Sequence, residues 1–112
     1  MRADRAIDVR QTLVTVGAIV FERGWLSSNN VLFRRCATVP ATLIDSGYHT
    51  HARLTLELVR RGLHGEPLGR VVNTHLHSDH CGGNAALQAE WSCEALVPQA
   101  SLAMVASAAA CF

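Results

Sequence analysis

The first half of the chain alternates short apolar runs with clusters of turn-forming residues. Runs rich in Val, Ile, Thr and Phe that are bounded by such clusters are typical of β-strands. They predict three strands, at residues 12–21, 30–34 and 41–45. A Ser-Ser-Asn-Asn cluster precedes the second strand, and a Ser-Gly pair follows the third.

A helical pattern follows the third predicted strand. Apolar side chains recur there at the spacing of one helix face, at Ala52, Leu56, Val59 and Leu63. Thr50 is expected to cap the helix, and Gly62 is expected to end it at the C′ position. Arg60 and Arg61 fill the last turn, where cations are favourable.

The second half of the chain predicts a strand at 69–74, a helix at 85–91 and a strand at 95–98. A polar loop separates the first of these strands from the helix. Strands that alternate with helices indicate an α/β fold, here with an antiparallel section at its start, so that α+β is the neighbouring class. The pattern shows no internal repeat.

Length and composition fit one small domain. The chain has 112 residues, of which 49% are hydrophobic and 17% are charged, which is too apolar for intrinsic disorder. The formal net charge of +1 argues against a strongly basic surface, so we expect no nucleic-acid partner. The N-terminal apolar run is far shorter than the roughly 20 residues that span a bilayer, and no cleavage site follows it, so we expect neither an anchor nor a signal.

The four cysteines are widely spaced and form no Cys-x-x-Cys pair, which argues against a zinc ribbon or a thioredoxin-like motif. Without a signal peptide, the simplest interpretation is that they are reduced thiols in a cytoplasmic protein.

The candidate chemistry lies directly after the strand at 69–74. Four side chains that can bind a metal fall within residues 75–80, namely His75, His77, Asp79 and His80. Residues at i and i+2 of an extended segment point the same way, so His75 and His77 can bind one cation. Asp79 and His80 come after the chain has begun to turn, and can face a second cation. Nitrogen and oxygen donors of this kind suit zinc best, with iron or manganese tolerated.

Other metal-competent side chains carry a simpler interpretation. His49, His51 and His64 precede the motif without a ligand-like spacing, and we interpret them as surface residues. The side chain of Cys81 diverges from that of its neighbour His80, which argues against a role as a ligand. Gly82 and Gly83 let the backbone turn sharply beside the metals.

The segment His75-Leu-His-Ser-Asp-His80 resembles the first zinc-binding motif of the metallo-β-lactamase superfamily. The strand and turn at 41–47, the helix and the strand before the motif resemble that superfamily as well. The resemblance implies an αββα sandwich. It implies that His75 and His77 bind the first metal and that Asp79 and His80 bind the second, with Asp79 also orienting the attacking water. Asp45 resembles the acidic residue that supports the metal-binding loop by hydrogen bonding, the outer-shell role that ligands generally need.

The implied activity is that of a zinc-dependent hydrolase with a small-molecule substrate. Two zinc ions acidify a shared water and polarise the bond that is attacked, so no protein nucleophile is required. Hydroxide would then attack an ester, thioester or amide. A glyoxalase II-like thioester or ester hydrolase is the favoured subgroup. Lactonase, β-lactamase and phosphodiesterase or nuclease activities share the motif and stay open.

The rest of the family's ligand set is missing. No His or Asp follows His80, and Glu90 and Glu94 are the only later acids. The last 18 residues, 95–112, carry no charge at all. We therefore expect residues 1–112 to form a single truncated domain, the N-terminal half of the sandwich, with one sheet face left uncovered.

Two alternatives from other classes follow from this gap. The chain can be a catalytically inactive truncated or frameshifted fragment that binds metal weakly, since a Lys-free, Arg- and Ala-rich composition is typical of GC-rich coding DNA. It can also be a small metal-binding module that functions as a homodimer.

Overall fold

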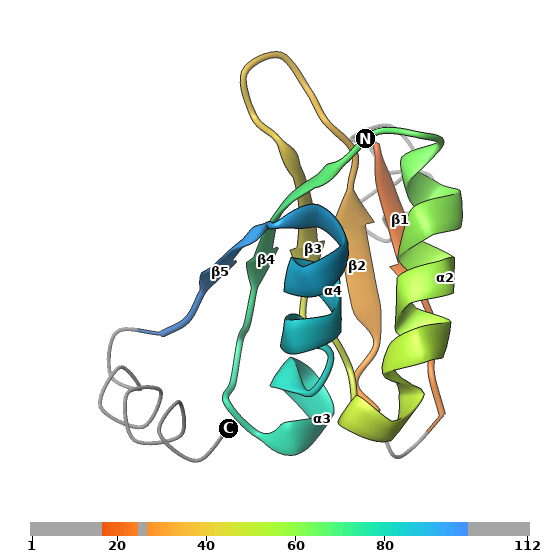
Figure 1. Ribbon diagram of the computed structural model, residues 1–112, viewed down its shortest axis with the longest axis vertical. Coiled ribbons are helices and arrows are strands. Elements are labelled where there is room, and N and C mark those ends of the chain that lie inside the picture. The colour runs from red at the N-terminus through yellow and green to blue at the C-terminus, as the bar shows by residue number, and fades with distance from the viewer. Residues whose placement is uncertain (1–16, 25–26, 99–112) are drawn as a thin grey trace, which may run out of the picture.

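A computed structural model describes residues 17–24 and 27–98 of the chain. Its strands form one sheet in sequence order: β1 (Ala18–Phe21), β2 (Asn30–Phe33), β3 (Ala41–Ile44), β4 (Leu68–Val72) and β5 (Glu94–Leu96). The β1–β2 and β2–β3 pairs are antiparallel, and the β3–β4 and β4–β5 pairs are parallel (Figure 1). The predicted α/β architecture with an antiparallel start is confirmed.

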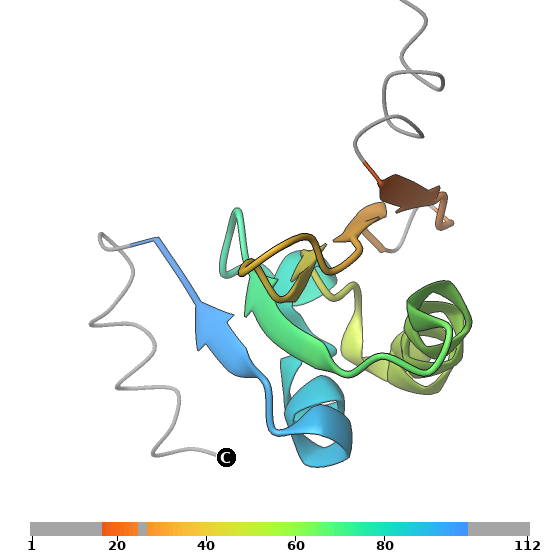
Figure 2. The ribbon, with the colours of Figure 1, turned by 90° about the horizontal axis from the view of Figure 1, so that it is seen from above.

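The helices lie in the two crossovers between the parallel strands. The elements are the 3₁₀ turn η1 (His49–His51) and the helices α2 (Ala52–Leu63), α3 (Ser78–Cys81) and α4 (Asn84–Trp91). Helix α2 connects β3 to β4, while α3 and α4 connect β4 to β5. Figure 2 shows that these helices cover one and the same face of the sheet. None of the helices in the described ranges is long and apolar enough to cross a membrane.

The core fills the space between this face and the helices. Leu32 pairs with Leu43 across the β2–β3 ladder, and Leu43 pairs with Val71 across β3–β4, so the three side chains lie in one row. All three are fully buried. The other buried apolar side chains of the cluster include Val59, Leu63, Leu68 and Leu87. Because α2 and α4 both contribute, the core holds the two crossovers to the sheet.

The opposite face of the sheet carries a second apolar row that runs across all five strands. Its members, linked in register, are Val20, Val31, Ile44, Val72 and Leu96. The two outer members are 38% and 39% exposed. No helix from the described ranges lies on this face (Figure 2). The described residues thus supply one helical layer and one sheet layer of the expected sandwich.

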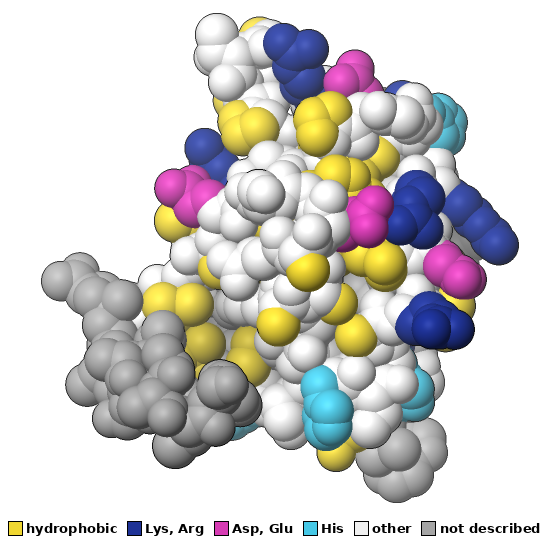
Figure 3. All heavy atoms as spheres, in the orientation of Figure 1, with side chains coloured by type: hydrophobic (Ala, Val, Ile, Leu, Met, Phe, Trp, Pro, Cys, Tyr) yellow, Lys and Arg dark blue, Asp and Glu magenta, His cyan; other side chains and the backbone are white. Residues whose placement is uncertain are grey.

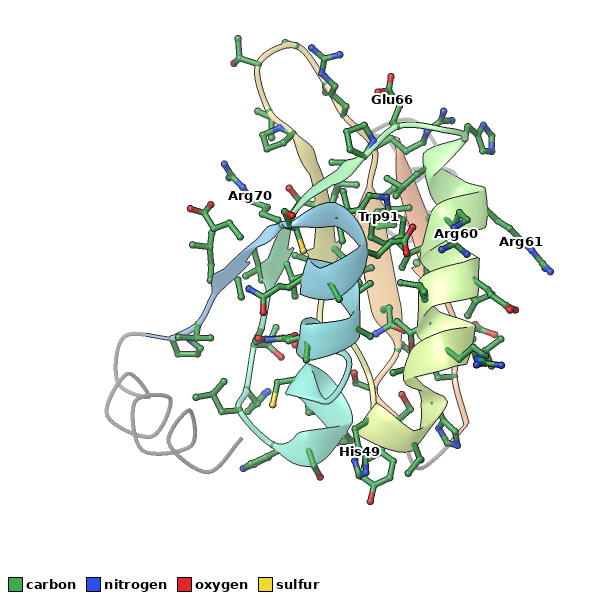
Figure 4. All side chains as sticks on the ribbon, in the orientation of Figure 1. His49, Arg60, Arg61, Glu66, Arg70 and Trp91 are labelled. Atoms are coloured by element: carbon green, nitrogen blue, oxygen red, sulfur yellow. The ribbon has the colours of Figure 1, made fainter. Side chains whose placement is uncertain are left out.

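Two side chains join the helices across the surface of the layer. Arg60 of α2 forms an ion pair with Glu90 of α4 at 3.1 Å, and its guanidinium lies 6.0 Å from the ring centre of Trp91 (Figure 4). Both residues of the ion pair are well exposed, so the pair contributes little to stability. Figure 3 shows a group of charged side chains over α2, with others at the top and the upper left of this face.

The predicted ends of the first helix are wrong at both sides. Thr50 lies inside η1, and α2 begins after His51 with no side-chain cap. Gly62 is an interior, buried residue, and the helix ends at His64 in the left-handed conformation, with φ of +52°. A Cβ atom on Gly62 would lie 2.7 Å from Leu32 Cδ2. This glycine therefore serves the close approach of the helix to the sheet and does not terminate the helix.

The strands are shorter than their apolar runs predicted. Residues 12–16 of the first predicted strand lie outside the described residues, and Gly17 forms a turn with positive φ. Arg34 and Asp45 fall just beyond the ends of β2 and β3. The fourth strand begins one residue earlier than predicted, at Leu68, and ends two residues earlier, at Val72, so residues 73 and 74 belong to the loop.

The segment that was predicted as a loop between β4 and the second helix contains the short helix α3. Four residues carry too weak a periodic signal for recognition in a sequence. The helix that follows begins at Asn84, one residue earlier than predicted, and the last strand is 94–96 instead of 95–98.

Candidate metal centre

The predicted site residues lie together at the carboxyl edge of the parallel strands. Asp45 directly follows β3, His75 and His77 lie in the loop after β4, and Asp79 and His80 belong to α3. Parallel neighbours end at the same edge of a sheet, and this edge is where open α/β sheets place their ligands. Figure 3 shows histidine side chains at this lower end of the molecule, near η1 and α3.

Three imidazole rings lie side by side. The ring centres of His75 and His77 are 5.6 Å apart with an interplanar angle of 21°, as expected for residues at i and i+2. His80 lies 4.7 Å from His75 and 6.4 Å from His77, measured between ring centres. The loop and α3 therefore bring together all three histidines of the motif.

Asp45 holds the beginning of the loop through both of its carboxylate oxygens. The main-chain N–H of Thr74 donates to Oδ1 at 2.8 Å, and the Thr74 hydroxyl donates to Oδ2 at 2.7 Å. Nδ1 of His80 is 3.0 Å from the same Oδ2. Asp45 is buried, and it adopts φ of +60°, a conformation that Asp tolerates better than most residues. The carboxylate thus contacts both the loop and α3.

His80 and Asp79 direct polar atoms at a common point. Nε2 of His80 lies 3.5 Å from Oδ2 of Asp79. Two ligands of one tetrahedral zinc at about 2.0–2.1 Å from the ion are separated by about 3.3 Å, so the pair fits a shared zinc ion. The donor types fit zinc as well. Among the described residues, however, no group of three or more His, Cys, Asp or Glu side chains is placed to hold a metal.

A partly buried amide network, which the sequence did not indicate, contacts both ends of the loop. Nδ2 of Asn84 donates to Oδ1 of Asn73 at 2.6 Å, and Nδ2 of Asn73 is 3.2 Å from Oδ1 of Asn84. The hydroxyl of Ser46 donates to the same Asn84 oxygen at 2.7 Å. The carbonyl of His80 accepts from the Ser46 main chain at 2.7 Å and from the Asn73 side chain at 3.2 Å. The only sequence signal was the position of both Asn residues beside the motif.

The glycines after the motif are needed for a reason other than the predicted sharp turn. Gly82 and Gly83 have ordinary helical backbone angles, with φ of −64° and −93°. A Cβ atom on Gly82 would overlap the main chain of His49 and lie 2.6 Å from the Ser78 carbonyl oxygen. A Cβ atom on Gly83 would overlap the carbonyl of Ser46. The two glycines therefore let α3 lie directly against the chain that follows β3.

A second hydrogen-bond network, which the sequence also did not indicate, contacts the main chain of Asp45. Nη1 of Arg23 donates to Oδ1 of Asn30 and to Oγ1 of Thr55, each at 2.7 Å. Nδ2 of Asn30 donates to the main-chain carbonyl of Asp45 at 2.9 Å. Burial lowers the pKa of the Arg23 guanidinium. Asn30 is fully buried, so water cannot replace the hydrogen bonds that its side chain makes.

The remaining histidines lie on the surface, as interpreted from the sequence. His49, His51 and His64 are exposed. Burial raises the pKa of the Cys81 thiol, and the charges of Asp45 and Asp79 raise it further.

The fold and this edge define a class: an α/β chain whose parallel strands end in a loop of imidazole and carboxylate donors. The profile of the Metallo-beta-lactamase superfamily matches residues 23–108, and the chain belongs to that superfamily. No curated protein matches the chain.

Solved structures of the superfamily share the fold. The metallo-β-lactamase with a HARLDQ motif from Cronobacter sakazakii superposes with a TM-score of 0.59 at 23% identity, over 75% of this chain and 31% of its own. MEM-A1, a subclass B3 metallo-β-lactamase from a soil metagenome library, gives a TM-score of 0.55 at 23% identity, over 70% of this chain and 29% of its own. The chain spans about a third of the length of these proteins. At such identities the likeness shows the fold alone.

Proposed function

We propose that the chain carries the first metal-binding loop of a zinc-dependent hydrolase. His75 and His77 would bind one zinc ion, and Asp79 and His80 would bind the second. The observation that carries the proposal is the placement of His80. Its Nδ1 faces the buried carboxylate of Asp45 at 3.0 Å, and its Nε2 faces Asp79 at 3.5 Å. This carboxylate–histidine pairing, with the far nitrogen left for an ion, is the arrangement that zinc sites generally use.

The chemistry that zinc supplies when bound is Lewis acidity toward water and toward a carbonyl oxygen. The part that this chain's own residues play is to position the reactants. The Asp79 side chain is 43% exposed, so its carboxylate can accept a hydrogen bond from a water molecule and hold that water for attack. Asp79 is therefore the proposed catalytic residue.

The proposed substrate is a small molecule with an ester, thioester or amide bond, and we favour a glyoxalase II-like thioester or ester. A nucleic acid is disfavoured, because a net charge of +1 provides little attraction for a polyanion. Iron or manganese can replace zinc, because imidazole and carboxylate donors accept these ions.

A second candidate is a chain that binds metal without hydrolysing anything. One observation favours it. The described residues place no group of three or more ligands around one point, whereas a catalytic zinc normally has three protein ligands. The small metal-binding module that acts as a homodimer belongs to this candidate.

The test combines metal content, oligomeric state and turnover of the full 112-residue chain. The chain is loaded with zinc, desalted and analysed for metal, and then assayed with a glutathione thioester, a lactone, a β-lactam and a phosphodiester. Bound zinc with thioester hydrolysis that is lost in His77→Ala and kept in His64→Ala supports the hydrolase. Bound zinc without turnover of any substrate supports the second candidate. Failure to retain any zinc would overturn both.

A further inference from the structure

The hydroxyl of Thr74 stands between Asp45 and the first histidine of the motif. Its oxygen lies 2.7 Å from Oδ2 of Asp45 and 3.0 Å from Nδ1 of His75. Nδ1 of His80 contacts the same Asp45 oxygen from another direction, at 3.0 Å. Two imidazole rings from two different elements are thus connected to one buried carboxylate, His80 directly and His75 through a hydroxyl group.

The direction of these hydrogen bonds follows from the groups themselves. An ionised carboxylate only accepts, and a threonine hydroxyl has a single proton to donate. At 2.7 Å the Thr74 hydroxyl gives that proton to Asp45, so only its lone pairs remain for His75. Nδ1 of His75 must then carry a proton of its own. The same reasoning places a proton on Nδ1 of His80. In both neutral rings the unprotonated nitrogen is Nε2.

We propose that Thr74 is a positioning residue that transmits the orienting effect of Asp45 to His75. One carboxylate then sets the tautomer of two ligands, so that both present Nε2 to the metals. The inference rests on the proposed function, because the tautomer matters only if the histidines bind metal. The sequence alone assigns no role to Thr74, because a threonine at the predicted end of a strand is an ordinary β-branched residue.

The main-chain hydrogen bond of Thr74 allows its hydroxyl to be removed while the loop stays attached to Asp45. The Thr74 N–H donates to Oδ1 of Asp45 at 2.8 Å whatever side chain the residue carries. Thr74→Val keeps this bond and the shape of the side chain, and removes only the hydroxyl. Thr74 is exposed, so the extra methyl group meets no core packing. Thr74→Ser retains the hydroxyl and should rescue the wild-type behaviour.

The first measurement needs no metal. Long-range ¹H–¹⁵N spectra of the metal-free, ¹⁵N-labelled chain report which ring nitrogen of each neutral histidine is protonated. We expect His75 and His80 in the Nδ1–H form in the wild type and in Thr74→Ser. In Thr74→Val, His75 should lose this preference while His80 keeps it. Thr42→Val, which removes a hydroxyl that donates to Pro40 instead, is the matched control and should change neither ring.

The second measurement is cobalt(II) binding, followed through its visible absorption. Loss of an orienting partner typically weakens metal affinity about 10- to 100-fold, and we expect that loss in Thr74→Val with recovery in Thr74→Ser. An unchanged His75 tautomer in Thr74→Val would overturn the proposal even if the wild type binds cobalt. If the wild type shows the expected tautomers but binds no cobalt, the proposed function is overturned. The hydrogen-bonded connection from Asp45 through Thr74 to His75 is then still supported.

Discussion

Asn73 and Asn84, which stand on either side of the histidine-rich loop, are hydrogen-bonded to each other through both of their side-chain amides. Asn73 also donates to the carbonyl of His80, so this Asn73–Asn84 pair contacts one of the proposed ligands. Ser46, next to Asp45, joins the same network from β3's end. Hydrogen bonds outside the proposed metal positions therefore shape the loop.

The hydrogen bonds between Asn73 and Asn84 predict a specific effect of Asn84→Asp. The variant keeps an acceptor for Ser46 and Asn73 but replaces the amide that donates to Asn73 with an oxygen, so two acceptors face each other at the present 2.6 Å. Asn73 is buried, and its unsatisfied oxygen should lower the free energy of unfolding by about 1–3 kcal/mol. Urea unfolding measures this change. Asn29→Asp is the control, because it makes the same amide-to-acid change at an exposed residue and keeps the side-chain oxygen that accepts from the Arg23 main chain. It should change little, and equal losses in the two variants would contradict the Asn73–Asn84 pairing.

Gly82→Ala is expected to destabilise the chain because α3 lies against main chain. The new Cβ atom would overlap the main-chain nitrogen of His49 and lie 2.8 Å from the carbonyl oxygen of Gly47, and backbone atoms have little freedom to move away. We expect a loss of about 1–3 kcal/mol in the free energy of unfolding, as for other overpacked sites. Gly24→Ala is the control, since nothing lies within 4 Å of its Cβ position. A thermal melt that shows equal transitions for the two variants would argue against the close packing.

Much of the fold was predictable because its signals are local. The strands at 30–34 and 41–45 and the stripe through Val59 and Leu63 follow from periodicity alone, since burial selects apolar residues at regular spacing. The strand and helix ends were less accurate. Gly62 looked like a terminator, and only the distance to Leu32 across the sheet shows why a glycine stands there.

The candidate site is also predictable only in part from the sequence. Its donors are close in sequence, so the motif from His75 to His80 could be recognised. The partners that hold these donors come from other elements. Thr74, Asn84 and Asn30 are polar residues of common type. A sequence does not show that they contact His75, Asn73 and Asp45, respectively. Whether the histidines bind metal stays a prediction.

The Cys93 thiol predicts how stability depends on alkaline pH. Burial raises its pKa above the ordinary value of 9.0, so the folded chain retains this proton at pH values where the unfolded chain has lost it. The stabilisation is complete below pH 9.0 and is lost as the pH rises through the folded-state pKa. Urea midpoints between about pH 8 and 10.5 should therefore fall more steeply in the wild type than in Cys93→Ala. Cys36→Ala, at an exposed thiol, should follow the wild type, and a slope unchanged in Cys93→Ala would contradict the assignment.

The adjacent residues Asn29 and Asn30 allow the support of Asp45 to be tested with a matched pair of variants. Both side-chain carbonyls accept a hydrogen bond from Arg23, Asn29 from the main chain at 2.8 Å and Asn30 from the guanidinium at 2.7 Å. Only Asn30 is buried, and only Asn30 also donates to the Asp45 carbonyl. Asn30→Ala leaves that carbonyl without a partner and removes one of the two hydrogen bonds that Nη1 of Arg23 donates, so we expect a loss of about 2–3 kcal/mol.

Asn29→Ala leaves the main-chain N–H of Arg23 to donate to water instead, and we expect a loss of no more than about 1 kcal/mol in the free energy of unfolding. Urea unfolding of the two variants gives the comparison. Arg23→Met adds the discriminating step, because in its background Asn30→Ala no longer removes a hydrogen bond from the guanidinium and should destabilise the chain less. Additive losses in the double variant would mean that Arg23 and Asn30 act independently, and that the buried network does not connect the β1–β2 turn to Asp45.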